Sequence, residues 1–204
     1  MTRSASPSIQ KQIKTGNAVG INIEKDVVGD REHKKRRFSS FVRECYSKNK
    51  KITLSEKNLS QKAAKIALGF AEPDYTDFYP RIKGKTKRVI LTPIYEINDE
   101  IPDLLVLFSC PGRIMEMIQK FVSSTGKALN PYCMSSGSSV ASELVAYPYI
   151  EEKANISFLC SGAREVAGYK DKNMGISFPD KLLVKRFEKT EGLKNEEKSQ
   201  KDYK

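Results

Sequence analysis

A continuous apolar run that leads directly into an amphipathic pattern constrains the fold of this chain most. "DLLVLFS", residues 103–109, has no alternation of apolar and polar side chains, which is typical of a strand buried on both faces. "CPGRIMEMIQKFVSSTG" follows, with Pro111 suited to a first helical position, apolar residues at helical spacing, and Gly126 suited to a helix end. The segment predicts a strand, a turn and a helix, which is half of a βαβ unit.

Strand and helix patterns alternate along the rest of the chain. We expect strands at residues 17–23, 52–54, 88–97 (interrupted at Pro93), 155–160 and 174–179. We expect a helix with the apolar stripe Phe38, Phe41, Val42 and Cys45, and a second helix at residues 63–68 before Gly69. A third helix is expected after the Ser-rich turn at residues 135–139; it would direct Val140, Ala141, Leu144 and Val145 inward and stop at Pro148. A short helix or turn is expected at residues 161–169, and a last helix from near Pro179. The alternation predicts an α/β fold: a single domain with a mixed β-sheet flanked by helices.

The domain itself is predicted to cover residues 17–191. Residues 1–16 lack periodicity and are expected to be a disordered lead-in, and residues 192–204 are expected to be a charged tail. A chain of 204 residues is long enough to bury a core without disulfides or metal.

The cysteine and hydropathy patterns favour a cytoplasmic protein. The four cysteines are widely spread and form no CxxC pair, which is typical of reduced thiols (Cys45, Cys110, Cys133 and Cys160). No run approaches the roughly 18 apolar residues of a membrane span, and the start of the chain has no apolar signal region. The single histidine, His33, lies among charged residues, so no zinc-ligand spacing exists and no metal site is predicted.

The net charge of +11 is concentrated in two basic segments, residues 31–37 and 81–88. Such segments bind nucleic acid or another polyanion without sequence preference, or they are simply a solvated surface. Phe38 and Phe41 lie beside the first segment, but their spacing with Val42 indicates a core face rather than base stacking.

Two turns rich in small polar residues are the main candidates for a ligand site. The first is Ser135, Ser136, Gly137, Ser138 and Ser139, which opens a helix and offers hydroxyl and backbone donors to an anion. The alternative is ordinary helix capping by serine.

The second candidate is "CSGAR", residues 160–164, at the end of a strand. Cys160 would form a wall or supply a thiol, Ser161 and Gly162 would form the turn, and Arg164 would clamp a carboxylate or phosphate. The alternatives are a buried apolar role for Cys160 and a structural ion pair for Arg164. A third turn, at Cys110, would place a thiol at a helix start, where its pKa falls, but no base is available beside it.

We therefore expect a small anionic ligand or cofactor to bind where the two turns meet. The sequence names no cofactor and no reaction, since it contains no phosphate-binding loop, dinucleotide motif or nucleophile elbow, and no histidine can activate the serines. The different-class alternatives are polyanion binding through the basic segments and a scaffold subunit without a site of its own.

Several stretches resemble, in order and spacing, an uncharacterised prokaryotic family, domain of unknown function 169. They are "IPDLLVLFSCPGRIMEMIQKFVSSTGKAL", the stretch from "SSGSSVASELVAYPY" to "MGISFP", and the early "NAVGINI". The resemblance implies a cytoplasmic single-domain α/β protein and no known activity. It also implies family cysteines near Ser39 or Ser40, near Ser60 or Gln61, and near Ala141. Only Cys160 matches here, so if those cysteines hold a metal or cluster in relatives, this chain has lost that capacity.

Overall fold

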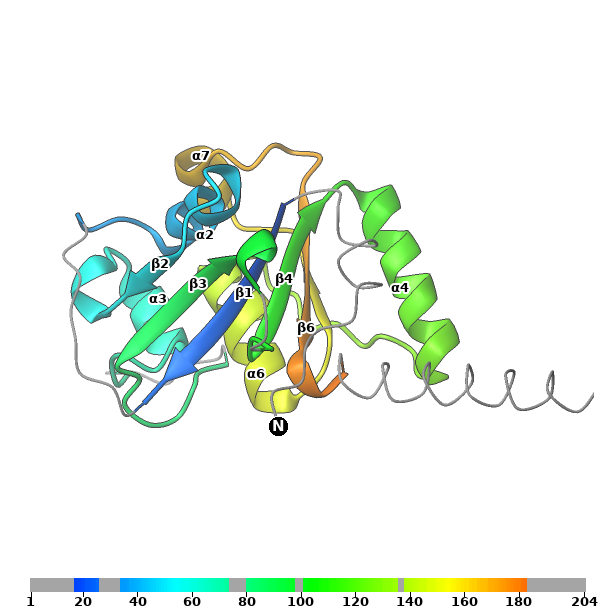
Figure 1. The fold of residues 1–204 in the computed structure, drawn as a ribbon, viewed down its shortest axis with the longest axis horizontal. Helices are drawn as coiled ribbons and strands as arrows, with labels where there is room; N and C mark the ends of the chain where they lie inside the picture. The colour runs from blue at the N-terminus through cyan, green and yellow to red at the C-terminus, as the bar shows by residue number, and fades with distance from the viewer. Residues whose placement is uncertain (1–16, 26–33, 74–79, 98–100, 136–137, 183–204) are drawn as a thin grey trace, which may run out of the picture.

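The computed structural model describes residues 17–25, 34–73, 80–97, 101–135 and 138–182. They form one α/β domain around a six-stranded sheet in the order β2-β3-β1-β4-β6-β5 (Figure 1). These strands are β1 (Asn17–Glu24), β2 (Ile52–Leu54), β3 (Arg88–Pro93), β4 (Leu104–Ser109), β5 (Asn155–Ser157) and β6 (Met174–Pro179). The predicted lead-in at 1–16, the end of the predicted domain at 183–191 and the predicted tail at 192–204 lie outside the described residues.

The α/β class is confirmed, but the expectation of a mixed sheet is wrong. Every pairing between the described strands is antiparallel, including the pairing of the central strand β4 with β1 and with β6. The expected βαβ crossover after β4 does not form, because β6 returns beside β4 in the opposite direction. The apolar run of β4 did not distinguish a parallel from an antiparallel sheet, since helices cover both faces of this sheet and a central strand is buried on both faces in either case.

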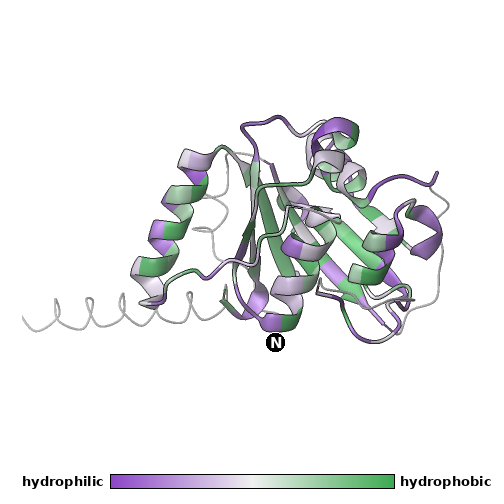
Figure 2. Ribbon diagram, turned by 180° about the vertical axis from the view of Figure 1, so that it is seen from behind, coloured by the Kyte–Doolittle hydropathy of each residue, from purple (hydrophilic) through white to green (hydrophobic). Residues whose placement is uncertain are grey.

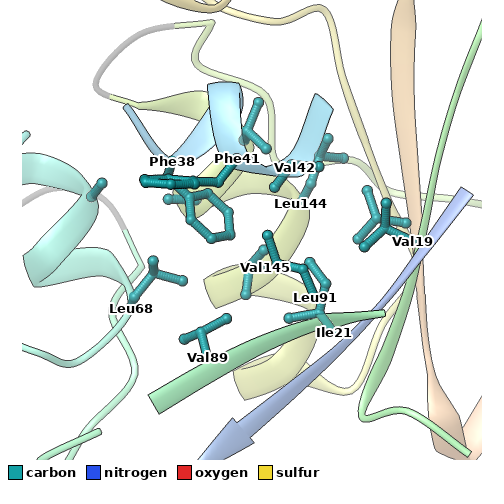
Figure 3. Close-up of a cluster of buried hydrophobic side chains, with 14 of the residues drawn as sticks. Val19, Ile21, Phe38, Phe41, Val42, Leu68, Val89, Leu91, Leu144 and Val145 are labelled. Atoms are coloured by element: carbon teal, nitrogen blue, oxygen red, sulfur yellow. The ribbon is translucent and has the colours of Figure 1, made fainter. Parts of the chain in front are cut away.

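One face of the sheet carries the main core. Alternate residues of β1 and β4 pack there against α2 (Phe38–Ser47), α3 (Lys62–Ala67), α5 (Ser139–Ala141) and α7 (Ser161–Ala167). Figure 3 shows Phe38, Phe41 and Val42 of α2 above the sheet residues Ile21 and Leu91. The apolar stripe predicted at Phe38, Phe41, Val42 and Cys45 is fully buried, which confirms the helix that it indicated.

The opposite face of the sheet is covered by α4 (Pro111–Thr125), which lies apart from the other helices (Figures 1 and 2). Pro111 occupies its first turn and Gly126 ends it in the left-handed conformation, as the sequence predicted. Ile114 is the buried residue of this helix, and it packs against Leu105 and Leu107 of β4.

The expected stop at Pro148 is wrong. The chain stays helical from α5 through a π-helical turn, η3 (Ser142–Ala146), into α6 (Tyr147–Glu151), which contains Pro148. A proline inside a helix lacks an N–H and its ring crowds the carbonyl group one turn earlier. The wider π turn directly before Pro148 is the kind of distortion that accommodates both effects.

The last predicted strand before the Cys160 turn is shorter than expected. It ends at Ser157 instead of reaching residue 160, because Leu159 adopts a left-handed conformation with φ of 68° that cannot continue a strand. The short helices η1 (Glu56–Asn58) and η2 (Ile94–Glu96) follow β2 and β3. The helix expected from near Pro179 is described only as far as Leu182.

Candidate functional site

The two predicted turns meet through one buried hydrogen bond. The Ser139 hydroxyl accepts a hydrogen bond of 2.8 Å from the backbone N–H of Cys160. Ser139 is 0% exposed and Cys160 is 9% exposed. Both α5 and α7 pack into the main core, so the two turns lie on the same face of the sheet. Ser136 and Gly137 lie outside the described residues.

Left-handed backbone conformations are concentrated in these turns. Ser135 has φ of 53°, Ser138 has φ of 66° and Leu159 has φ of 68°. Each such conformation costs a residue with a side chain on the order of 1 kcal/mol or more. Strained backbone of this kind is frequent at binding sites, where the surrounding structure holds it in place.

A buried glutamate, Glu143, holds the Ser-rich turn in place. Its carboxyl oxygens accept hydrogen bonds from the backbone N–H groups of Met134 at 2.8 Å and Ser135 at 2.7 Å, and from the hydroxyl of Ser157. The thiol of Cys133 lies 3.7 Å away as a weak fourth donor. Glu143 is not among the site residues predicted from the sequence. The available signal was its position three residues after Val140, on the helix face that the apolar pattern directs inward.

The Cys160 thiol lies among hydrogen-bond donors. Burial by itself raises the pKa of this thiol, but hydrogen bonds from the Ser139 hydroxyl and from the backbone amides of Ser139, Ala163 and Gly162 lower it below its usual range. Ser138 extends the polar contacts of the site, because its hydroxyl lies 3.3 Å from the side-chain oxygen of Gln61 at the start of α3.

Arg164, the predicted anion clamp, is engaged by its own segment of chain. Its guanidinium donates to the carbonyl groups of Lys170 at 2.7 Å, Phe158 at 2.6 Å and Asn173 at 3.4 Å, and lies 3.8 Å from the carboxylate of Asp171. These bonds close the loop between α7 and β6. The contacts of Arg164 thus match the alternative considered above, in which this arginine has a structural role.

A different arginine lies at the second turn. Arg37, the residue before α2, packs its guanidinium against Gly162, so that a methyl group on Gly162 would overlap Nη1 of Arg37. The guanidinium forms no hydrogen bond or ion pair with another described residue. The available signal for this arginine was weak: α2 starts without a Ser, Thr, Asp or Asn cap, and such a helix often has a different partner at its start.

The positions that the family resemblance singles out lie at neighbouring helix starts. Arg36 bridges to Leu59 just before α3, Ser138 contacts Gln61, and Arg37 contacts Gly162. The starts of α2, α3, α5 and α7 therefore adjoin one another. Within the described part of the chain, no group of three or more His, Cys, Asp or Glu side chains could hold a metal ion.

The other sequence candidates lie elsewhere. Cys110 is exposed at the start of α4 on the other side of the sheet. Hydrogen bonds from backbone amides, of which that of Arg113 has the largest effect, lower the pKa of its thiol. In the second basic segment, Arg88 bonds to Glu24 and Arg81 lies 3.9 Å from Glu72, while the lysines between them are exposed. Of the first segment, residues 34–37 are described and 31–33 are not. Polyanion binding and a scaffold role stay predictions.

These thiol environments predict an order of alkylation by iodoacetamide. Cys110 will react first because it is exposed, and it will react at a lower pH than a free cysteine does because the pKa of its thiol is lowered. Cys45 will react last, since burial raises its pKa to about 12. Peptide mapping by mass spectrometry of native protein sampled over time at pH 7 to 9 measures the order. Early labelling of Cys45 in the folded protein would contradict the described packing of α2.

The fold and the site define an α/β domain with an antiparallel sheet and two polar turns joined on one face. The chain belongs to the family described as "Uncharacterised ArCR", domain of unknown function 169, whose model matches residues 75–189. It is 25% identical over 107 residues to "Uncharacterized protein MJ0308" of Methanocaldococcus jannaschii. The aligned region makes up 52% of this chain and 45% of that protein. The chain thus spans less than half the length of this relative. No solved structure matches. In the described residues, no helix combines the length and apolar character of a membrane span.

Proposed function

We propose that this protein binds a small ligand with an anionic group at the junction of the Ser135–Ser139 and Cys160–Arg164 turns. The observation that carries the proposal is the buried hydrogen bond from the Cys160 N–H to the Ser139 hydroxyl. It joins two turns through residues that are 21 positions apart in the chain, so that the small polar side chains of both turns lie close together on the same face of the sheet.

The chemistry of the junction supports an anion. Two of its polar groups are donors: the Ser138 hydroxyl and the guanidinium of Arg37 beside Gly162. The carboxyl group of Glu143, which holds the Ser-rich turn, is already turned toward three donors of the protein and is fully buried. A ligand that only accepts hydrogen bonds matches this set.

The rigidity of the junction supports binding as well. The left-handed residues Ser135 and Leu159 are held by contacts on either side: Glu143 accepts from the N–H of Ser135, and the N–H of Leu159 donates to the Ser157 hydroxyl at 3.0 Å. The same glutamate also accepts from Ser157, so one buried side chain fixes both turns. A prearranged set of donors lowers the entropic cost of binding.

Native mass spectrometry of the full-length protein purified from its own host tests this proposal. We expect the wild type to carry the mass of a small molecule and Ser139→Ala to lose it, because alanine cannot accept the hydrogen bond from Cys160. Ser123→Ala is the matched control on exposed α4, where the hydroxyl bonds only to the Gln119 carbonyl, and it will keep the ligand.

Ser138→Ala is the second variant for the case in which Ser139→Ala does not fold. It keeps the hydrogen bond between the Cys160 N–H and Ser139 and removes only the Ser138 hydroxyl donor, so it will fold and will bind the ligand more weakly. The proposal is overturned if the wild type carries no small molecule, or if both junction variants retain it at the level of Ser123→Ala.

A further inference from the structure

The start of helix α2 is buried but has no cap. Its N-cap residue is Arg37, no side chain caps it, and its first turn contains no acidic residue. The backbone N–H groups of Phe38 and Ser39 donate to no other described residue, while those of Ser40 and Phe41 bond to the Arg37 carbonyl. Buried helix ends normally have partners for these donors, and a bound anion is one such partner.

A second, independent observation is the free hydroxyl of Ser39. This residue is 6% exposed, and its hydroxyl forms no hydrogen bond with another described residue. Ser39 belongs to the same stripe of α2 as Arg43 and Tyr46, because residues four and seven apart lie on one helix face. Arg43 donates to the Ala167 carbonyl at 2.5 Å and Tyr46 packs on Tyr169, so this stripe faces α7. The Ser39 side chain is therefore directed toward the space between α2 and α7.

Helices α2 and α7 run in the same direction at this place. Arg37 contacts Gly162 at the start of α7, and Arg43 contacts Gly168 at its end. The start of α2 thus lies beside the Cys160 turn and not at the far end of α7. The uncapped N–H groups, the Ser39 hydroxyl and the Arg37 guanidinium face the same junction as the proposed ligand site.

We propose that this corner of α2 is a phosphate seat, in which Arg37, Ser39 and the first N–H groups of α2 hold the phosphoryl group of the ligand. The inference rests on the proposed function and names the chemical class of its ligand. A guanidinium can bind two phosphate oxygens, and the α2 amides and the Ser39 hydroxyl can bind a third. A planar carboxylate offers two oxygens and would leave part of this set unused. Lys34 and Lys35, both exposed just before Arg37, add attraction for a doubly charged group.

Gly162 provides the most selective variant. In Gly162→Ala the new methyl group occupies the position of the Arg37 guanidinium, which is the free end of a flexible side chain and can move away. The charge of the protein is unchanged, and alanine is a better helix former than glycine. Gly112→Ala is the matched control: Gly112 is also the second residue of its helix, it also follows a cysteine by two positions, and nothing lies near its added methyl group.

The experiment is isothermal titration calorimetry of the full-length protein with inorganic phosphate, with phenyl phosphate and with acetate as separate titrants. We expect phosphate to bind, Arg37→Gln to weaken it about tenfold or more, and Ser39→Ala to weaken it about threefold. Gly162→Ala will weaken it about tenfold with an unchanged or raised melting temperature, and Gly112→Ala will bind as the wild type does. Tighter binding of phenyl phosphate than of phosphate identifies a phosphorylated molecule, and the reverse identifies the free ion.

Two results would overturn the phosphate seat: no binding of either phosphate titrant, or equal affinity in the wild type, Arg37→Gln and Gly162→Ala. Preferential binding of acetate would also overturn it. These results are separate from failure of the proposed function. If the co-purified ligand is lost in Ser139→Ala but no phosphate binds, the junction is a ligand site of another chemistry. If phosphate binds at Arg37 and no co-purified ligand depends on Ser139, the proposed function fails instead.

Discussion

Replacing Glu143 by alanine will lower the free energy of unfolding by about 3 kcal/mol. The carboxyl group accepts from Met134, Ser135 and Ser157 in a fully buried position, and the variant leaves these donors without a partner. The unsatisfied buried hydroxyl of Ser157 costs about 1–3 kcal/mol, the N–H groups of half-buried Met134 and exposed Ser135 add less because water can reach them, and the lost desolvation cost of the carboxyl group offsets part of the sum. Urea unfolding followed by circular dichroism measures the change.

The control variants separate the shape of this side chain from its hydrogen bonding. Glu143→Gln keeps one acceptor oxygen for the two backbone N–H groups, so we expect a loss of about 1 kcal/mol. Glu116→Ala removes an exposed glutamate on α4 whose ion pair with Arg113 is of the weak surface kind, and it will change stability by less than about 0.5 kcal/mol. A loss in Glu143→Ala no larger than that in Glu116→Ala would contradict the role of Glu143 as the anchor of the Ser-rich turn.

Most of the fold was accessible from the sequence because its elements follow local patterns. The stripe from Phe38 to Cys45, the apolar run of β4, and the glycine after α4 each identify one element at the observed place. Strand direction was not accessible in this way. A strand such as β4 shows the same apolar run in a parallel sheet and in an antiparallel sheet covered on both faces, so the mixed sheet was inferred from a pattern that both arrangements share.

The candidate site was predicted in part, and the missing part is non-local. The serine and cysteine turns stand out in composition, and the structure brings Ser139 to Cys160. Which arginine lies at the junction depends instead on the parallel packing of α2 and α7, which are more than 100 residues apart in the chain. Arg164 is close to Cys160 in sequence, yet its donors bind the carbonyl groups of its own loop, while Arg37 reaches the turn from another helix. Proximity in the sequence therefore pointed to Arg164, whereas the guanidinium that contacts Gly162 belongs to Arg37.

The second large effect is expected for Gly69→Ala, which will lower the free energy of unfolding by about 3 kcal/mol. Gly69 follows α3 with φ of 76°, a conformation that costs alanine about 1 kcal/mol. An added methyl group would also lie 2.7 Å from the backbone oxygen of Ile82 and 2.9 Å from Oγ1 of Thr86. Since the Ile82 oxygen is a backbone atom, the whole segment at 80–88 must shift, which weakens the hydrogen bond from the Thr86 N–H to the Gly69 carbonyl.

Gly126→Ala isolates the contribution of this close approach. Gly126 ends α4 with φ of 66°, so alanine has the same conformational cost there, but nothing lies within 4 Å of the added methyl group. We expect Gly126→Ala to cost about 1 kcal/mol, so that the difference of about 2 kcal/mol between the two variants measures the contact of α3 with the basic segment 81–88. Equal losses in the two variants, measured by urea unfolding under the same conditions, would show that this segment is not held against α3.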